Sequence, residues 1–387
     1  MHILHVTPYY APAYAFGGVV RAVEGLALAL VARGHQVTVL TTDAHDLNRR
    51  THQPANEIRD GVHIVRVPNR VYALRRLNLS TPWGIGGAAA ERLADVDVMH
   101  LHEFRTIENL LVAPQAARRG ILVVLSPHGT LDLATGRGGL KHWWDRLLSP
   151  ALMRRIDAVV GLHTGETEMA RALWRSAHLD AIFETIPNGI DVDKKLDDGL
   201  ARAFRAQWGL DDALVCLFLG RLHARKGVEP LARAFAQLDM PDARLVIAGP
   251  DEGLLTALKP LADADSRIVL TGFLDGDTRL GALAAADCFA LPATGEGLSM
   301  AMLEAAAAGL PLLLAPGCNF PEAERAGAAL IVEPQVESLR QALAALLTDG
   351  ERRAQMGMAA QTLAREQFAW PVIAARWERI YAEKTKR

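Results

Sequence analysis

The sequence predicts an α/β protein made of two consecutive doubly wound domains, each a parallel β-sheet covered by helices. Short apolar segments typical of buried strands alternate with amphipathic helical segments, which is the order found in parallel α/β sheets. The same rhythm restarts near residue 213, after the turn "IPNGID" at 186–191. A chain of 387 residues has room for both domains, because domains average roughly 100 to 200 residues.

The first domain opens with the strand candidate "HILHVT" and a loop rich in Pro and Gly. The segment "VVRAVEGLALALVARG" has apolar residues at i, i+3 and i+4 and ends at Gly34, as expected of a helix. The next strand candidate, "QVTVLTT", completes a β–loop–α–β unit. Further strand candidates follow at 63–68, 97–102, 121–129 and 158–164.

The second domain repeats this alternation of strands and helices. Helical patterns lie at 227–238 and in "SMAMLEAAAAG", and strand candidates include 213–220, 243–250, 267–273 and 288–293. We therefore expect domains at 1–188 and 189–370, with a terminal helix at 371–387 that returns to the first domain. Doubly wound sheets bind ligands beyond the carboxyl ends of their strands, so two such domains predict an interdomain ligand cleft.

Composition and charge restrict the class of protein. Half of the residues are hydrophobic and the net charge is −2, so the chain is globular and nothing in it calls for a nucleic-acid partner. Three cysteines without CxxC spacing favour a reducing compartment. The segment "MHILHVTPYY" does not resemble a signal peptide, and the apolar run 305–316 is shorter than the about 20 residues of a membrane span. We expect a cytoplasmic protein, either free or peripheral on the inner face of the membrane.

Two glutamates separated by eight positions stand out in "GEGLSMAMLE", after the strand candidate "CFALPA". Gly295 and Gly297 flank Glu296 and allow a ligand to approach the backbone closely. A helix starting near Leu298 would offer free N–H groups and the positive end of its dipole to an anion, with Glu304 inside it. At helical rise the two carboxylates would lie about 12 Å apart. That separation suits the ribose and sugar ends of a nucleotide diphosphate sugar, with the diphosphate at the helix terminus.

The loop after the strand candidate in "LFLGRLHARKG" carries two cations. A strand ends at Gly220, and Arg221 and Lys226 follow it. Cations at the carboxyl end of a parallel strand suit phosphate oxygens. A solvated surface loop is the alternative interpretation of this segment taken alone.

Taken in order, these segments resemble retaining glycosyltransferases of the GT-B fold, specifically glycosyltransferase family 4. The segment "EGLSMAMLE" matches the E-x7-E motif of that family, and "GRLHARKG", "IPNGID", "VIAGPDEG" and "GGVVRAVEGLALALVARGHQVTVLTT" extend the resemblance over nearly the whole chain. The resemblance implies two Rossmann-like domains that face an interdomain cleft. The first would bind the acceptor and the second a nucleotide-sugar donor.

The resemblance also implies roles for individual residues. Arg221 and Lys226 would hold the diphosphate and stabilise the leaving nucleotide, Glu296 would contact the transferred sugar, and His128 would be the active-site histidine of the first domain. Glu304 would bind the ribose. The residues expected to bind the donor are Gly17, Gly18, Asn188, Gly220, Gly249, Phe273, Leu274, Gly297, Leu298, Ser299 and Glu304.

The activity implied is a retaining hexosyltransferase that uses a UDP-, GDP- or ADP-sugar and a hydroxyl acceptor, in bacterial polysaccharide or glycolipid assembly. Attack from the front face of the sugar is the mechanism usually proposed for this family. Two alternatives stay open: a nucleotide-sugar epimerase of the same fold, which would have no acceptor, and a non-catalytic nucleotide-sugar-binding protein.

We expect no metal and no other cofactor. The "DVD" segments at 95–97 and 191–193 adjoin a strand and a turn, so we do not interpret them as metal sites. His100 and His102 in "HLHE" share one strand face, but no third ligand can be identified, which favours packing or acceptor contact over metal binding.

A membrane-surface contact is a further hypothesis. The segment "RGGLKHWWDRLLSPALMRRID" at 137–157 combines Trp, Lys and Arg with apolar residues, as in helices that lie on a membrane interface. Such a contact would suit a lipid-linked sugar acceptor. An amphipathic surface helix with partly buried tryptophans is the alternative.

Overall fold

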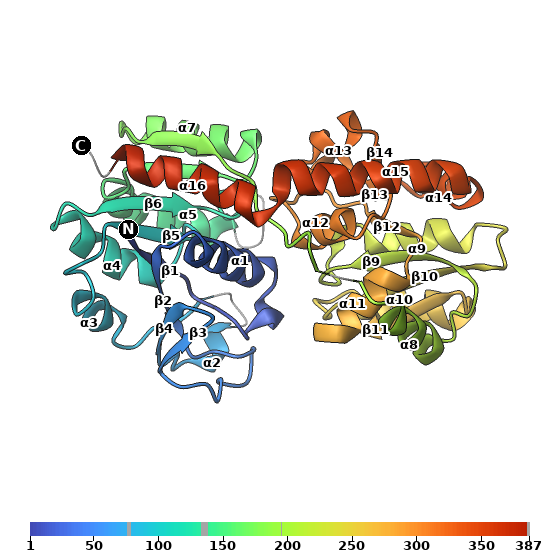
Figure 1. The fold of residues 1–387 in the computed structure, drawn as a ribbon, viewed down its shortest axis with the longest axis horizontal. Helices are drawn as coiled ribbons and strands as arrows, with labels where there is room; N and C mark the ends of the chain where they lie inside the picture. Colours follow the sequence, from blue (N-terminus) through green and yellow to red (C-terminus); the bar gives the residue numbers. More distant parts are fainter. Residues whose placement is uncertain (76–78, 133–137, 195, 385–387) are drawn as a thin grey trace. The chain divides into compact units, whose positions relative to one another are not determined.

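The computed structural model describes residues 1–75, 79–132, 138–194 and 196–384, and it divides the chain into two compact units. Unit 1 comprises Met1–Gly189 and Trp370–Arg387, and unit 2 comprises Ile190–Ala369. Each unit is a parallel or mainly parallel β-sheet with helices packed on it (Figure 1), which confirms the predicted fold class. The returning segment starts at Trp370, one residue before the predicted position.

Unit 1 contains an eight-stranded sheet of order β3-β4-β2-β1-β5-β6-β7-β8. All neighbours are parallel except β3 and β4. The strands are β1 His2–Val6, β2 Gln36–Thr42, β3 Asn56–Arg59, β4 Val62–Val67, β5 Val98–His102, β6 Leu122–Ser126, β7 Ala158–Gly161 and β8 Ile182–Thr185. The helices are α1 Gly18–Ala32, α2 Tyr72–Arg75, α3 Ile85–Ala90, α4 Ile107–Ala117, α5 Gly138–Leu147, α6 Ser149–Met153, α7 Thr164–Ser176 and α16 Trp370–Lys384, with a 3-10 turn at Tyr14–Phe16.

Alternate residues of the strands in unit 1 face two different hydrophobic cores. Leu4 and Met99 belong to the core that α3, α4, α6 and α7 cover, whereas Ile3 and Val98 belong to the core under α1 and α16. Side chains two residues apart on a strand share a face. Because of this alternation, His5, His100 and His102 lie on the same face as Ile3 and Val98, which α1 and α16 cover. They lie on the carboxyl side of these apolar residues in β1 and β5.

Helix α16 lies beside α1 on the sheet of unit 1 (Figure 1). Trp370 packs so tightly on Gly25 of α1 that a Cβ atom there would lie 2.2 Å from its indole ring. At the other end of α16, Glu378 accepts hydrogen bonds from Arg33 Nε at 2.7 Å and bonds to His35 Nε2 at 2.8 Å. The end of the chain is thus an integral part of unit 1.

Unit 2 contains a six-stranded parallel sheet of order β11-β10-β9-β12-β13-β14. Its strands are β9 Leu214–Leu219, β10 Ala243–Ala248, β11 Ile268–Gly272, β12 Cys288–Leu291, β13 Leu312–Leu314 and β14 Ala329–Ile331. Its helices are α8 Asp198–Trp208, α9 Val228–Ala236, α10 Leu255–Ala264, α11 Gly276–Ala285, α12 Met300–Ala307, α13 Pro321–Arg325, α14 Val336–Thr348 and α15 Gly350–Leu363, with 3-10 turns at Ala224–Lys226 and Pro316–Cys318 and a short π-helix at Ala364–Phe368.

The segment 137–157 forms two helices rather than the single helix predicted. Helix α5 ends at Leu147, and α6 begins at Ser149 with Pro150 in its first turn. Proline has no N–H and its ring clashes with the carbonyl four residues earlier, which favours a helix break just before it. Position 137 lies outside the described residues.

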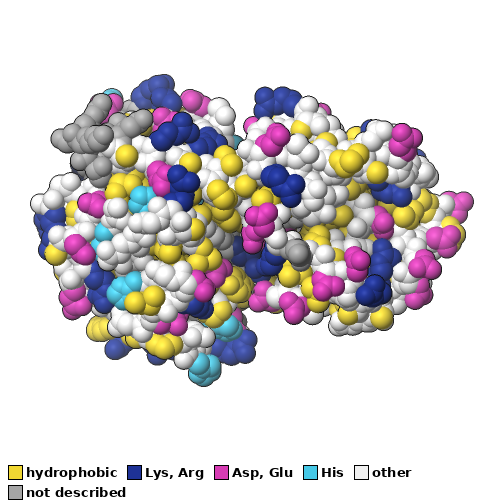
Figure 2. All heavy atoms as spheres, in the orientation of Figure 1, with side chains coloured by type: hydrophobic (Ala, Val, Ile, Leu, Met, Phe, Trp, Pro, Cys, Tyr) yellow, Lys and Arg dark blue, Asp and Glu magenta, His cyan; other side chains and the backbone are white. Residues whose placement is uncertain are grey.

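Acidic and basic side chains are interspersed on the face of each unit that Figure 2 shows, in keeping with the small net charge. Within the described ranges, no helix is both long and apolar enough to span a bilayer. The three cysteines are buried free thiols.

Candidate active site

The sheet of unit 2 reverses its strand order between β9 and β12. From β9 the chain adds β10 and β11 on one side, then crosses to β12 and adds β13 and β14 on the other. Ligands of doubly wound sheets bind beyond the carboxyl ends of the strands at this reversal. The loop after β9 contains Arg221 and Lys226, and the loop after β12 contains Glu296. The structure therefore brings the two charged loops singled out in the sequence to one place.

Lys226 and Glu296 form an ion pair across these loops. Lys226 Nζ lies 2.7 Å from Glu296 Oε2, and the two side chains are only 12% and 11% exposed. The backbone of Glu296 is fixed on both sides, because its N–H donates to the carbonyl of Gly317 at 2.8 Å and its carbonyl accepts from Asn319 Nδ2 at 2.6 Å. A largely buried pair held in this way presents one positive and one negative group at a defined position.

Glycines allow the loops to approach each other closely. Gly227 has φ 68°, and a Cβ atom there would lie 2.0 Å from the carbonyl oxygen of Pro292. Gly249 has φ 154°, and its Cβ would lie 1.7 Å from the carbonyl oxygen of Gly220. By contrast, a Cβ at Gly295 would meet nothing within 4 Å. Gly227 and Gly249 are thus required by packing, and Gly295 leaves open space beside Glu296.

The other two predicted charged residues also have partners. Arg221 donates to Glu252 at 2.8 and 3.1 Å, and both side chains are more than a third exposed. Glu304 on α12 accepts from Arg279 Nε of α11 at 3.0 Å, in a pair about 85% buried. Sequence reasoning missed Glu252 and Arg279. A signal for Glu252 existed in "GPDEG", which follows β10, the neighbour of β9.

The remaining predicted residues of unit 2 lie at the same edge of the sheet. Gly297, Leu298 and Ser299 lead into α12, which begins at Met300 rather than near Leu298 as predicted. Ser299 is the N-cap residue of that helix, and its extended ψ of 124° ends the helical conformation there. Phe273, 46% exposed, and buried Leu274 follow β11.

Unit 1 places the other predicted residues around its own strand ends. Gly17 is the N-cap residue of α1 and Gly18 its first residue. His128, in the loop after β6, and Asn188, after β8, line one small cavity together with His102, Ser126, Leu162 and Trp377. The structure therefore brings His128 and Asn188 together.

The backbone of His128 is held in a conformation that few non-glycine residues adopt. Its φ is 54°, in the left-handed region. The next residue, Gly129, donates its N–H to the buried carboxylate of Glu166, which also accepts from the N–H of Leu162 at 2.8 Å. Thr130 Oγ1 donates to the carbonyl of Pro127 at 2.6 Å. Surroundings that fix an unusual conformation so firmly are typical of functional sites.

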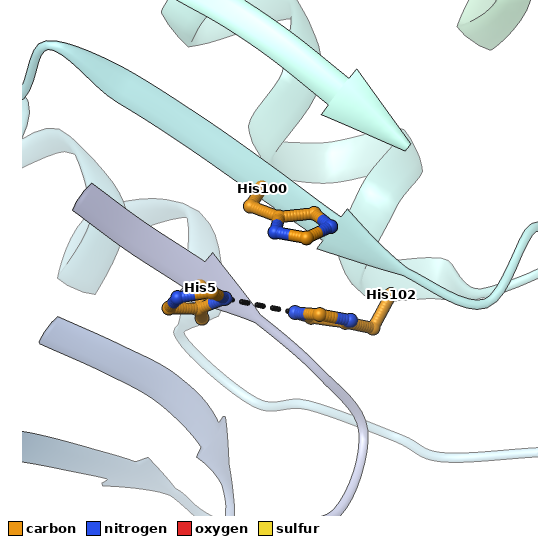
Figure 3. Close-up of side chains that lie close together, drawn as sticks. All are labelled: His5, His100 and His102. Carbon is orange, nitrogen blue, oxygen red and sulfur yellow. Dashed lines mark hydrogen bonds between the residues drawn. The ribbon is translucent and has the colours of Figure 1, made fainter. Parts of the chain in front are cut away.

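A third histidine joins His100 and His102 in the interior of unit 1 (Figure 3). His5 of β1 pairs in register with His100 of β5, so the three rings lie on one face of neighbouring parallel strands. His5 Nδ1 lies 2.9 Å from His102 Nε2, and His102 Nδ1 lies 2.9 Å from His128 Nε2. The sequence did not reveal this third histidine, because His5 is far from "HLHE" in the chain and adjacent only through strand pairing.

Hydrogen bonding and ring stacking count against metal binding by this cluster. One nitrogen from each of His5, His100 and His102 lies within 4.8 Å of the others, as a shared ligand would require. However, His100 Nδ1 bonds to Tyr381 Oη and His100 Nε2 to Ser126 Oγ, both at 2.8 Å. The rings of His100 and His102 stack with centroids 4.2 Å apart and planes 32° apart, so their in-plane lone pairs do not converge well.

Burial keeps the histidines of this region uncharged. It lowers the pKa of His5 to about 3 and that of His128 to about 4. The pKa values of His100 and His102 also lie well below the usual range, through burial and then the neighbouring histidines. Unit 1 thus presents neutral imidazoles at its strand ends.

The "DVD" segment at 95–97 has a structural role. Asp97 accepts the backbone N–H of His2 at 2.7 Å, and Asp95 lies 3.3 Å from the ring of His2. Among the residues that the structure describes, neither "DVD" segment belongs to a group of three or more side chains placed to share a metal ion.

Comparison with known proteins identifies relatives of both units. The family model for Glycosyltransferase Family 4 matches residues 16–194, and the model for Glycosyl transferases group 1 matches residues 201–363. A GDP-mannose-dependent alpha-(1-6)-phosphatidylinositol monomannoside mannosyltransferase of Mycolicibacterium smegmatis is 30% identical, over 69% of this chain and 72% of its own. A GDP-mannose-dependent monoacylated alpha-(1-6)-phosphatidylinositol monomannoside mannosyltransferase of Corynebacterium glutamicum is 32% identical, over 59% of this chain and 64% of its own.

Solved structures match over the whole chain. Anabaena Alr3699/HepE in complex with UDP-glucose has a TM-score of 0.76 at 18% identity, covering 99% of this chain and 100% of its own. The sucrose-phosphate synthase of Thermosynechococcus elongatus has a TM-score of 0.74 at 19% identity, covering 99% and 98%. These matches show that the fold is GT-B.

Proposed function

The chain belongs to glycosyltransferase family 4, and from this premise we propose that it is a retaining hexosyltransferase that moves a sugar from a nucleoside diphosphate sugar to a hydroxyl acceptor. The observation that carries the proposal is the Lys226–Glu296 pair at the strand reversal of unit 2, where such sheets bind ligands. The pair supplies a cation for the leaving phosphate and a carboxylate for sugar hydroxyls.

Each of the four charged residues predicted for the site of unit 2 has a role in this proposal. Arg221 and Lys226 bind diphosphate oxygens, as cations do at developing negative charge. Glu296 accepts hydrogen bonds from the transferred sugar, and Glu304, oriented by Arg279, accepts them from the ribose. The N–H groups of Gly297 and Leu298 and the exposed ring of Phe273 complete the donor site, with Gly220, Gly249, Leu274 and Ser299 shaping its walls.

The reaction breaks the bond between the sugar C1 and the phosphate oxygen, and the electron pair leaves with the phosphate. The acceptor hydroxyl oxygen forms the new bond to C1 from the same face, and its proton passes to the leaving phosphate. Neither Glu296 nor Glu304 acts as the base, since both carboxylates are engaged with cations. In unit 1, His128, Asn188 and the N-terminus of α1 at Gly17 and Gly18 contact the substrates. No step in this scheme uses a metal.

The favoured donor is GDP-mannose, because the mannosyltransferases of Mycolicibacterium smegmatis and Corynebacterium glutamicum are named for it. Thermal-shift measurements with GDP-mannose, UDP-glucose and ADP-glucose test donor choice, since a ligand that binds only the folded state raises stability.

NMR of the product tests the mechanism: the α-configured donor should give an α-linked product, and a β-linked product would refute retention. Donor incubated alone should hydrolyse slowly; its epimerisation would favour an epimerase.

The proposal places the acceptor on a lipid in the inner leaflet of a bacterial membrane, reached through α5 and α6. Trp143 and Leu147, four residues apart on α5, are 58% and 54% exposed, and Arg146, Arg154 and Arg155 of the same segment are also exposed. Apolar side chains flanked by arginines suit an anionic lipid surface. Both mannosyltransferases named above act on phosphatidylinositol monomannosides, according to their names.

Flotation with vesicles containing anionic lipid tests this contact. The variant Trp143→Ala should float less than the unaltered chain, whereas Trp83→Ala, which removes another exposed tryptophan of unit 1, should float equally well. Equal flotation of both variants, or no flotation at low salt, would refute the contact.

A further inference from the structure

A chain of three histidines runs through unit 1 from β1 to the loop after β6. Each link joins the Nδ1 atom of one ring to the Nε2 atom of the next: His5 to His102 and His102 to His128, both at 2.9 Å. At the two ends of the chain, His5 Nε2 and His128 Nδ1 are buried and have no hydrogen-bond partner. His128 lines the cavity that it shares with Asn188.

The geometry of the links requires all three rings to have the same tautomer. A neutral imidazole carries one donor and one acceptor, and each link needs one of each. If every ring carries its proton on Nδ1, His5 donates to His102, His102 donates to His128, and His128 Nδ1–H is a donor at the end of the chain. If every ring carries it on Nε2, the direction reverses, and His128 Nδ1 becomes an acceptor.

The two ends of the chain differ in their surroundings, and this difference selects the direction. Either form leaves one buried N–H group without a protein acceptor: His5 Nε2–H in the Nε2–H form and His128 Nδ1–H in the Nδ1–H form. His128 lines the cavity with Asn188, where a water or ligand oxygen can accept its N–H, whereas His5 is not among the residues that line it. Orphaned buried N–H groups are rare, so the form that places the N–H group at the cavity is favoured. Burial also lowers the pKa of each ring, so all three are neutral at pH 7, as the chain requires.

We infer that His5 and His102 are positioning residues that hold His128 in the Nδ1–H tautomer, so that His128 offers a hydrogen-bond donor, and not a base, to an oxygen atom of the bound substrate. The involvement of substrate rests on the proposed function, whereas the tautomer does not. Reversing the donor would require three protons to shift together. A fixed donor suits a sugar hydroxyl or a phosphate oxygen, and His100 stays outside the chain because Tyr381 and Ser126 occupy its nitrogens.

Long-range ¹H–¹⁵N spectra of the full chain, labelled in its imidazole rings, measure the tautomers without any substrate. Signals of His5, His102 and His128 are assigned from single substitutions. At pH 7 we expect all three to be neutral and protonated on Nδ1. Protonation of His128 on Nε2, different tautomers along the chain, or a stoichiometric metal ion whose removal shifts these signals would overturn the inference.

Two substitutions of His102 separate positioning from packing. His102→Asn places an amide N–H near the Nδ1 position and keeps the donor to His128, whereas His102→Gln reaches the Nε2 position and removes it. We expect kcat of His102→Gln to be about ten-fold or more below that of His102→Asn, with KM less affected and the His128 signals altered only in the Gln variant. His100→Asn is the control for loss of a buried imidazole, and it should leave the His128 tautomer unchanged.

Equal losses in His102→Asn and His102→Gln, with the same His128 tautomer in both, would show a purely structural role and overturn the inference. If the unaltered chain transfers no sugar at all, the proposed function fails, and the spectra still decide the tautomer.

Discussion

The two units have the same type of sheet, but the side chains at the point where the strand order reverses are charged in unit 2 and neutral in unit 1. In unit 2, three cations and three carboxylates form the pairs Lys226–Glu296, Arg221–Glu252 and Arg279–Glu304. In unit 1, the corresponding position between β1 and β5 holds buried neutral histidines. One fold thus supports two chemistries, and residues at the strand ends decide which. Charges suit a nucleoside diphosphate, and neutral donors suit hydroxyl groups.

The largest effect is expected from Lys226→Ala. Removing the cation that stabilises the leaving phosphate should lower kcat about 10³-fold, in the range found when one electrostatic stabiliser of a transition state is lost. The measurement is sugar transfer under saturating donor. The matched control is Arg233→Ala, which removes a solvent-exposed partner of Glu229 on α9 and should leave turnover unchanged. Unchanged turnover in Lys226→Ala would refute the assignment of the site.

Gly249→Ala should destabilise unit 2 by about 2 to 4 kcal/mol. Its Cβ would collide with the carbonyl oxygen of Gly220 at 1.7 Å, and overpacking alone typically costs about 1 to 3 kcal/mol. The control is Gly295→Ala, whose Cβ meets nothing within 4 Å. Urea unfolding should show the loss in Gly249→Ala only. Similar stabilities of the two variants would contradict the close approach of the loops after β9 and β10.

Mild acid should weaken unit 1 selectively. The pKa values of His5, His100, His102 and His128 are lowered by folding, so their stabilisation is complete above pH about 6.5 and is lost as pH falls toward their folded pKa values. Glu108 and Glu166 oppose this, because burial raises their pKa values and they retain protons that the unfolded chain releases. The four histidines gain almost four protons on unfolding and the two glutamates release almost two, so a net uptake of about two protons corresponds to about 3 kcal/mol per pH unit between pH 6 and 5.

Hydrogen exchange, corrected for intrinsic rates, measures this loss strand by strand. Amides of β1 and β5 should lose protection between pH 6 and 5, while those of β9 and β12 serve as the internal control. A parallel loss in both units would show that the neutral histidines do not govern the acid stability of unit 1.

The smallest effect is expected from Glu304→Gln, compared with Glu296→Gln. If Glu304 holds the ribose, Glu304→Gln should raise KM for the donor about ten-fold and leave kcat nearly unchanged. This is the result expected when the lost interaction binds the ground state and the transition state equally. Glu296→Gln should instead lower kcat, because Glu296 is assigned to the transferred sugar. Steady-state kinetics of the two variants distinguish these roles. The same kcat loss in both would contradict the division.

Local sequence pattern predicted much of the fold. Apolar strands alternating with amphipathic helices gave the two doubly wound sheets, since hydrophobic periodicity is a local property. It could not show that α5 and α6 are separate helices, although Pro150 was a signal, nor that α12 begins at Met300. The exact position of a helix end depends on capping and tertiary contacts, and it can shift by a residue or two from the end that the local pattern predicts.

The candidate site was predictable only where its residues are close in sequence. The "GEGLSMAMLE" and "GRLHARKG" segments carried their own signals, and the structure places Lys226 and Glu296 in contact. The partners Arg279 and Glu252 and the histidine His5 were missed, because strand order and register bring them into place. A pairing of the first strand with "DVMHLH" would have been needed to find His5.

The most direct test of the division between the units is hydrogen exchange of the full chain with and without GDP, with UDP as a second probe. We predict that the diphosphate protects the segments 219–227 and 292–304 of unit 2, and that Lys226→Ala abolishes this protection. Protection confined to the strand ends of unit 1, or undiminished in Lys226→Ala, would contradict the assignment of the diphosphate to the charged site of unit 2.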